Sequence, residues 1–203
     1  MNLSVVVSTQ PASFQAATFK GDLAANLQTV AGLGYQGAEL AIRDPGRVDQ
    51  PELERLLQLH HLHVPAIGTG QAWGEEGLSF TDPDESVRMA AIQRIQSHIP
   101  LAERLGAVII IGLVRGVLKP GVSLNQAKSW LVEALRACCL AARTSGVRLA
   151  LEPINRYETS LVNNCMEGLD LIECVGEPNF GLLLDTFHMN IEEPDILASI
   201  QAC

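Results

Sequence analysis

Residues 107–114 read Ala-Val-Ile-Ile-Ile-Gly-Leu-Val, the longest apolar run of the chain, and the run ends at Arg115. A helix that crosses a membrane needs about 18 or more apolar residues, so this run is too short for one. Its β-branched residues favour a strand, and a strand that is apolar on both faces is typical of a buried parallel sheet. We therefore predict a central, fully buried strand at residues 107–114.

Strand-like and helix-like segments alternate on both sides of this run. The predicted strands are residues 3–9, 37–42, 64–70, 107–114, 148–154 and 180–186. The predicted helices are residues 22–33, 51–62, 82–105, 123–146 and 164–176, and a last one that opens after Pro194. This alternation predicts an α/β fold of six βα units. No linker or change of composition divides it, so we expect a single domain over residues 1–203.

Residues that cap helices stand at three of the predicted helix starts. Asp82 is followed by Glu85 three residues later, which predicts a capping box. Ser123 and Asn164 stand at the starts of the next two helices in the same way.

Two parallel architectures fit this order, an open doubly wound sheet and a closed (β/α)₈ barrel. The first predicted strand leads into Ser8-Thr9-Gln10-Pro11 rather than a glycine-rich phosphate turn, which disfavours a dinucleotide fold. A barrel normally needs about 250 residues and eight units, and this chain offers six. Periodicity alone does not choose between the two.

Charge is distributed unevenly along the chain. The formal net charge is −9, and residues 1–156 hold 14 acidic and 14 basic residues, so the whole acidic excess lies between Glu158 and Cys203. This excess disfavours a nucleic-acid partner. The five cysteines show no C-x-x-C spacing, and the start Met1-Asn2-Leu3-Ser4 lacks the basic residues of a secretory signal. We therefore expect a cytoplasmic protein with reduced thiols and no membrane partner.

Acidic residues follow the fifth and sixth predicted strands. Glu152 comes after Leu149-Ala-Leu, and Asp185 comes after Leu182-Leu-Leu, with Glu158 and His188 close behind them. The carboxyl ends of parallel strands meet at one edge of the sheet, where function is located. For either acid alone, a salt bridge or a helix cap remains an alternative. Carboxylates with an imidazole suit a divalent ion such as Mn²⁺, Mg²⁺, Co²⁺ or Zn²⁺.

Two stretches in this region resemble a known family. They are Leu-Glu-Pro-Ile-Asn-Arg-Tyr-Glu-Thr at 151–159 and Leu-Asp-Thr-Phe-His-Met-Asn-Ile-Glu-Glu at 184–193, with Asn163-Asn164 and Val-Gly-Glu-Pro-Asn at 175–179 between them. Together they resemble the xylose isomerase-like TIM-barrel superfamily of sugar isomerases and epimerases, and most of all its ketose 3-epimerases of the tagatose/psicose type. The resemblance implies a (β/α)₈ TIM barrel, of which about six βα units are present.

The resemblance also implies roles for four residues. Glu152 and Asp185 match two ligands of a single divalent metal ion, with Mn²⁺ favoured, and Glu152 also matches a catalytic acid/base. Glu158 and His188 match residues that hold substrate hydroxyls. The implied reaction moves a proton next to the carbonyl of a ketose through an enediolate. The substrate would be a small sugar or sugar phosphate.

This sequence departs from the family pattern in two places. Strands seven and eight, which would supply a His ligand, a Glu ligand and the second acid/base, have no counterpart in it. We therefore expect a C-terminally truncated product or a homo-oligomer in which another subunit covers the gap. In addition, Arg115 at the end of the fourth predicted strand favours an anionic or phosphorylated sugar.

Other functions on the same fold remain open. An aldose-ketose or hydroxypyruvate isomerase, or an inosose-type dehydratase, would use the same metal, and an inactive truncated fragment would serve as a binding module. The endonuclease IV-like group is disfavoured because Gly68-Thr69-Gly70 and Gly112-Leu113 stand where its His ligands would be.

Three remaining features have simpler interpretations. His60, His61 and His63 are expected at the end of a helix as capping residues. The pair Cys138-Cys139 is expected to pack in the core. Trp73 is expected either on the wall of a sugar site or on its rim.

Overall fold

A computed structural model describes residues 2–11 and 19–203 and contains one sheet of six short parallel strands. The strands are β1 (Ser4–Ser8), β2 (Gly37–Ala41), β3 (Ala66–Gly68), β4 (Val108–Ile111), β5 (Leu149–Leu151) and β6 (Phe180–Leu182). Their order in the sheet is the order of the sequence. In a doubly wound sheet this order would reverse at a switch point, so the sheet is the wall of a barrel.

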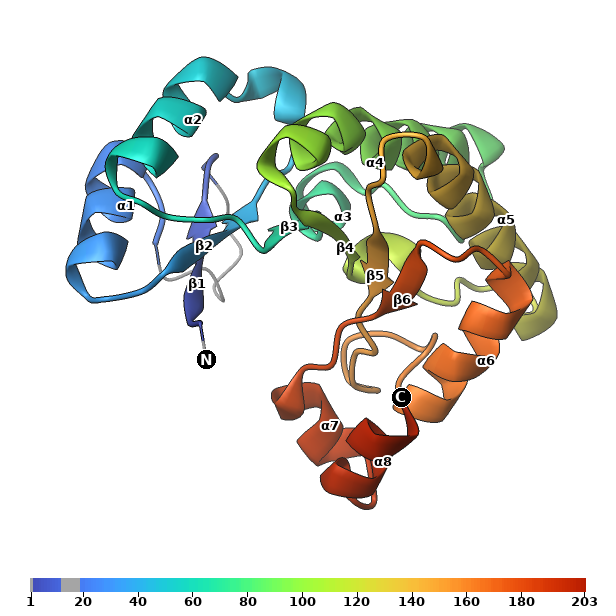
Figure 1. Ribbon diagram of the computed structural model, residues 1–203. Helices are drawn as coiled ribbons and strands as arrows, with labels where there is room; N and C mark the ends of the chain where they lie inside the picture. Colours follow the sequence, from blue (N-terminus) through green and yellow to red (C-terminus); the bar gives the residue numbers. More distant parts are fainter. Residues whose placement is uncertain (1, 12–18) are drawn as a thin grey trace.

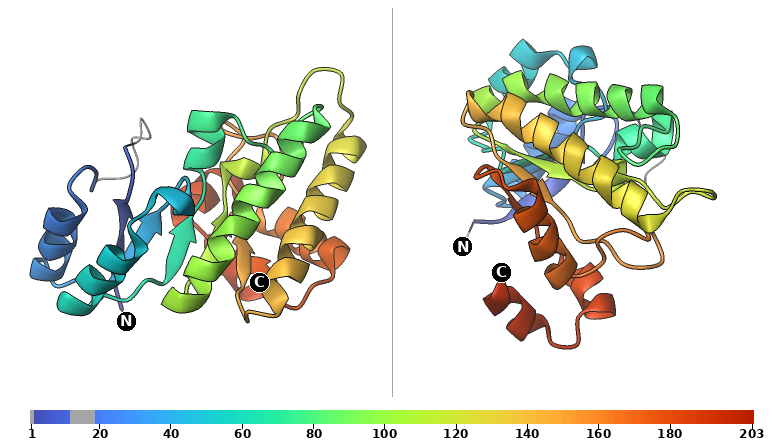
Figure 2. Two further views of the ribbon diagram at one scale, coloured as in Figure 1. Left: turned by 90° about the horizontal axis from the view of Figure 1, so that it is seen from above. Right: turned by 90° about the vertical axis from the view of Figure 1, so that its right-hand side faces the viewer.

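Helices follow each strand. They are α1 (Leu23–Gly32), α2 (Gln50–Leu59), α3 (Gln71–Glu76), α4 (Glu85–Leu105), α5 (Leu124–Arg143), α6 (Cys165–Val175), α7 (Thr186–Glu192) and α8 (Ile196–Ala202), with short 3₁₀ helices η1 (Pro45–Arg47) and η2 (Leu113–Arg115). The sheet curves, and α1, α2, α4, α5 and α6 cover its convex face (Figure 1). Figure 2 shows α4 and α5 side by side along the outside of the sheet.

The core lies between the sheet and these outer helices. Helix α5 buries one face, because its apolar residues recur every three to four positions, for example at Leu131, Leu135 and Cys138. These residues share one hydrophobic cluster with Ile109 and Ile111 of β4. The predicted burial of the central strand and of the cysteine pair 138–139 is thereby confirmed.

Several strand boundaries in the structure differ from the predicted ones. The predicted strand 107–114 ends at Ile111, and Leu113 and Val114 belong to η2 while Val114 stays buried. The predicted strand 180–186 ends at Leu182, and α7 begins at Thr186. The helices α3 and α7 were not predicted, since their short sequences carry no clear helical period.

The start of α4 also differs from its prediction. Asp84, and not Asp82, caps the helix by accepting a hydrogen bond from the backbone N of Ser86 at 2.8 Å. The Asp82 carboxylate is occupied by an ion pair with Lys119 and by the backbone N of Asp84. The predicted caps Ser123 and Asn164 are confirmed.

In the part of the chain that the structure describes, the β6 end of the sheet is open, and the β1 end is covered only at the single bridge between Val7 and Phe19. There β1 pairs with β2 alone and β6 pairs with β5 alone among the named strands. Among the described residues, no helix is both long enough and apolar enough to cross a membrane.

Candidate functional site

The end of β5 places Glu152 at the inner edge of the sheet. Its backbone N donates to the carbonyl of Ile111 at 3.2 Å, which continues the ladder between β5 and β4 by one residue. The side chain enters a cavity of about 660 Å³ and is 20% exposed.

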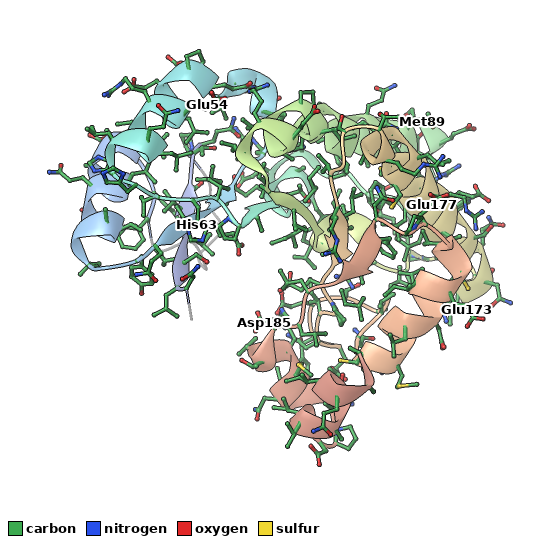
Figure 3. The ribbon with its side chains drawn as sticks, in the orientation of Figure 1. Glu54, His63, Met89, Glu173, Glu177 and Asp185 are labelled. Carbon is green, nitrogen blue, oxygen red and sulfur yellow. The ribbon has the colours of Figure 1, made fainter. Side chains whose placement is uncertain are left out.

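The end of β6 brings Asp185 to the same cavity. Its Oδ1 accepts a hydrogen bond from the backbone N of Phe187 at 2.8 Å and so caps α7. Its Oδ2 lies 3.9 Å from Nε2 of His188. Figure 3 shows Asp185 on the concave side, whereas Glu54, Met89 and Glu173 lie on the outer helices α2, α4 and α6. One carboxylate therefore caps a helix with one oxygen and faces the cavity region with the other.

His188, on the first turn of α7, joins the two acids. Its Nε2 lies 3.8 Å from Glu152 Oε1, and the residue is 8% exposed. One ligand atom from each of Glu152, Asp185 and His188 lies within 4.8 Å of the others. The structure thus brings together the three residues that the sequence placed at the ends of β5 and β6.

Asn155 connects the fourth predicted residue, Glu158, to His188. Its Nδ2 lies 2.8 Å from both Glu158 Oε1 and His188 Nδ1, while its Oδ1 accepts from the backbone N of Tyr157. This last bond fixes the amide orientation, so Nδ2 donates and Nδ1 of His188 must accept. The neutral imidazole therefore carries its proton on Nε2, the nitrogen that faces Glu152 and Asp185. In this state His188 is a hydrogen-bond donor to the cavity and not a metal ligand.

Acidic groups dominate the electrostatics. Burial, with the charge of Asp185 as the second cause, raises the pKa of Glu152 from 4.5 to about 7. The pKa of Glu39 on β2 is raised by burial and again by Asp185. The described lining of the cavity includes four carboxylates, those of Glu39, Glu152, Glu158 and Asp185, and no Lys or Arg. Such a cavity favours a cation.

Two lining residues escaped the sequence analysis. Glu39 lines the cavity and is the single charged residue of the stretch Gly37-Ala-Glu-Leu-Ala. A lone carboxylate in an otherwise apolar strand could have identified it from the sequence. Gln71, at the start of α3, is buried, donates from Nε2 to Ser8 Oγ, and has no partner for Oε1 among the described residues. No local pattern in the sequence marks it.

The expectation that Arg115 binds an anionic sugar is wrong. Arg115 is 0% exposed, does not line the cavity, and donates to backbone carbonyls only among its described hydrogen bonds. Trp73 lies on α3 and is not among the lining residues, which fits the rim and not the wall. His60 is the C-cap of α2. His60, His61 and His63 are not part of the metal-type cluster found in the described residues.

This combination of barrel wall and acidic edge has a match among known families. The model of the family described as "Xylose isomerase-like TIM barrel" matches residues 27–202. The chain belongs to this family. The fold that the resemblance implied is confirmed.

Relatives of this xylose isomerase-like chain include sugar epimerases. It is 30% identical over 172 residues to an L-ribulose 3-epimerase of Methylomonas sp. (strain DH-1), and 30% identical over 185 residues to a D-psicose 3-epimerase of Ruminiclostridium cellulolyticum. These matches cover 83% and 86% of the chain but 58% and 61% of the relatives. A crystal structure of D-allulose 3-epimerase from Methylomonas sp. in complex with D-allulose superposes with a TM-score of 0.80 at 27% identity, covering 99% of this chain and 68% of that one. The chain thus spans about 60% of the length of the two curated relatives.

Proposed function

We propose that this chain carries part of the active site of a metal-dependent ketose 3-epimerase, an isomerase acting on a small sugar. The observation that supports the proposal is the cluster of Glu152, Asp185 and His188 at the ends of two neighbouring strands, linked through Asn155 to Glu158. The names of the relatives supply the reaction class.

The residues present fit a divalent metal ion. Glu152 and Asp185 would hold it, since both offer carboxylate oxygens to the same point and Asp185 keeps Oδ2 outside its helix cap. Oxygen ligands suit Mn²⁺ or Mg²⁺, and Mn²⁺ is our first choice. When bound, the ion supplies positive charge that polarises the ketose oxygens and favours loss of the neighbouring C–H proton.

The side chains of this chain divide the remaining work. Glu152 removes the proton from the carbon next to the carbonyl, as a carboxylate that lines the cavity at the end of β5. Glu158 accepts a hydrogen bond from a substrate hydroxyl, and the Nε2–H of His188 donates one to a substrate oxygen. Asn155 holds both groups in these roles.

The substrate that suits the described lining is an unphosphorylated sugar. Four carboxylates and no Lys or Arg face the cavity there, so a phosphate group would be repelled. The relatives named for L-ribulose and D-psicose act on sugars named without phosphate.

The assembly and location expected from the sequence remain part of the proposal. A second acid/base must return the proton on the opposite face of the substrate, and we assign none of the described residues to that role. The expectation of a homo-oligomer is retained. The five cysteines are free thiols, which supports a cytoplasmic location. We also retain one domain over residues 1–203.

Calorimetric titration with Mn²⁺ tests the proposal. Asp185→Asn should weaken binding at least tenfold, while α7 remains capped because asparagine accepts the same hydrogen bond. Asp195→Asn is the matched control, since Asp195 caps α8 and does not line the cavity. Absent binding in the wild type, or equal binding in wild type and Asp185→Asn, would overturn the proposal for this chain.

A sugar panel then tests the reaction class. With Mn²⁺ present, D-allulose, D-tagatose and L-ribulose are incubated with the protein and the products are identified by NMR. Inversion at carbon 3 is expected. An aldose product would instead identify an aldose-ketose isomerase.

A further inference from the structure

Arg115 is a buried cation that does not line the cavity, although its charge acts on Glu152 and lowers the pKa of that carboxyl against the effect of burial. It follows β4 in η2, is 0% exposed, and takes part in none of the ion pairs found among the described residues. A buried charge without a directly bonded carboxylate is costly unless its donors are satisfied in another way, and arginine keeps its charge in proteins. Its hydrogen bonds must therefore hold a specific backbone arrangement.

Those hydrogen bonds join two segments. Nε donates to Gly112 O at 3.1 Å, and one terminal nitrogen donates to Ile111 O at 3.4 Å, both at the end of β4. The other terminal nitrogen donates to Leu161 O at 3.3 Å and Val162 O at 3.0 Å, in the loop between β5 and α6. The guanidinium thus cross-links the end of β4 to this loop, residues 153–164.

The contact falls on a strained residue. Val162 has a φ of 58°, and a β-branched residue in the left-handed region is an outlier that persists only where its surroundings fix it. Its carbonyl also accepts from the backbone N of Ile154 at 3.3 Å. Asn155 follows Ile154 in the sequence. The turn that Arg115 holds is therefore bonded to the residue directly before Asn155, which contacts Glu158 and His188.

A second contact supports the same arrangement. Thr159 Oγ1 donates at 2.9 Å to the carbonyl of Gly116, the residue after Arg115. Glu152, in contrast, is fixed by the β ladder and Asp185 by its helix cap. Among the residues proposed to hold the sugar, Glu158 therefore depends on the loop, and His188 on α7 depends on it through Asn155. The proposed metal ligands depend on the strands and α7.

We propose that Arg115 is a positioning residue that clamps the loop 153–164 so that Asn155 and Glu158, and through Asn155 also His188 on α7, face the sugar. The part that concerns sugar binding rests on the proposed function. The part that concerns the loop does not.

Hydrogen exchange measured by mass spectrometry tests the clamp on the whole chain. Arg115→Met should speed exchange in residues 153–163 at least tenfold, and Arg115→Lys should give a smaller increase because lysine keeps the charge with fewer donors. Arg136→Met is the control, because Arg136 also donates to backbone carbonyls, those of Cys174 and Val175, away from the site. Unchanged exchange in Arg115→Met, or the same loop exchange in Arg136→Met, would overturn the proposal.

Calorimetry distinguishes a specific effect on sugar binding from a general loss of structure. At saturating Mn²⁺ and at a pH well above the Glu152 pKa of about 7, Arg115→Met should weaken the affinity for D-allulose about tenfold without weakening the affinity for Mn²⁺. The alkaline pH is needed because Arg115 lowers the pKa of Glu152, and without that charge more of the Glu152 carboxyl would be protonated near pH 7 and would bind Mn²⁺ less well. Parallel loss of both affinities would show a merely structural role.

The clamp can still be tested if Arg115→Met does not fold or if the wild type binds no ligand. If Arg115→Met fails to fold, Arg115→Lys carries the test, and it must show faster loop exchange at unchanged urea stability. If the wild type binds neither Mn²⁺ nor D-allulose, the proposed function fails, while the exchange experiment still decides the clamp.

Discussion

Glu152 makes the metal-free protein sensitive to pH. Burial and the neighbouring Asp185 raise its pKa from 4.5 to about 7, so the folded state binds the proton more tightly than the unfolded state does. The contribution of Glu152 to stability is then full below about pH 4.5 and is lost as the pH rises through 7. From this group we expect the free energy of unfolding to fall by on the order of 3 kcal/mol between acidic and alkaline conditions.

Urea unfolding of EDTA-treated protein at pH 5 and pH 8 measures this fall. Glu152→Gln should remove most of it and make the protein more stable than the wild type at pH 8. The same substitution at the exposed Glu173 on α6 serves as the control. A wild-type pH dependence that persists in Glu152→Gln would contradict the assignment.

At the scale of the element, η2 depends on the glycine that ends it. Gly116 has a φ of 92°, and a Cβ there would lie 2.1 Å from Ser79 Oγ and 2.3 Å from Thr81 Oγ1. Gly116→Ala should therefore cost about 3 kcal/mol or more, from backbone strain and a clash with packed side chains.

Gly121 provides a matched control for this prediction. Its φ is 82°, but a Cβ there would have no atom within 4 Å. Gly121→Ala should cost only about 1–2 kcal/mol from the backbone conformation. The free energies of unfolding in urea compare the two variants, and equal losses would mean that the clash is absent.

The order of the elements was predictable because the change from strand to helix changes the spacing of apolar residues. The ends of the strands were not, since Leu113 and Val114 continue an apolar run although they form a 3₁₀ helix. Whether Asp82 or Asp84 caps α4 depends on Lys119, 35 or more positions away in the sequence. Such competition between partners is a property of the folded chain.

The residues of the candidate site were also predictable only in part. Glu152 and Asp185 were predictable because a carboxylate after a buried strand is conspicuous. Asn155 was not, because its importance comes from two contacts that the loop fold creates. Arg115 was misjudged for the reverse reason, since a charged residue at a strand end can also turn into the protein.

At the scale of the whole molecule, the sheet should be unevenly stable. β4 is bonded to β3 and β5, whereas β6 pairs only with β5 in the described chain. Amides of residues 109–111 should exchange with deuterium at least tenfold more slowly than those of residues 181–182, because an edge strand opens without breaking the core.

Hydrogen exchange at two protein concentrations checks this prediction. Equal protection of β4 and β6 would contradict an open edge in solution. If protection of β6 rises with concentration, another copy of the chain covers that edge, as the proposed homo-oligomer requires.

Asp185 serves two purposes with its two oxygens, and this has a genetic consequence. Asparagine can take over the cap of α7, but it cannot supply the negative charge that the proposed metal site needs. Both aspartate codons become asparagine codons by a single base change. A folded descendant of this protein that has lost the proposed metal site is therefore one point mutation away.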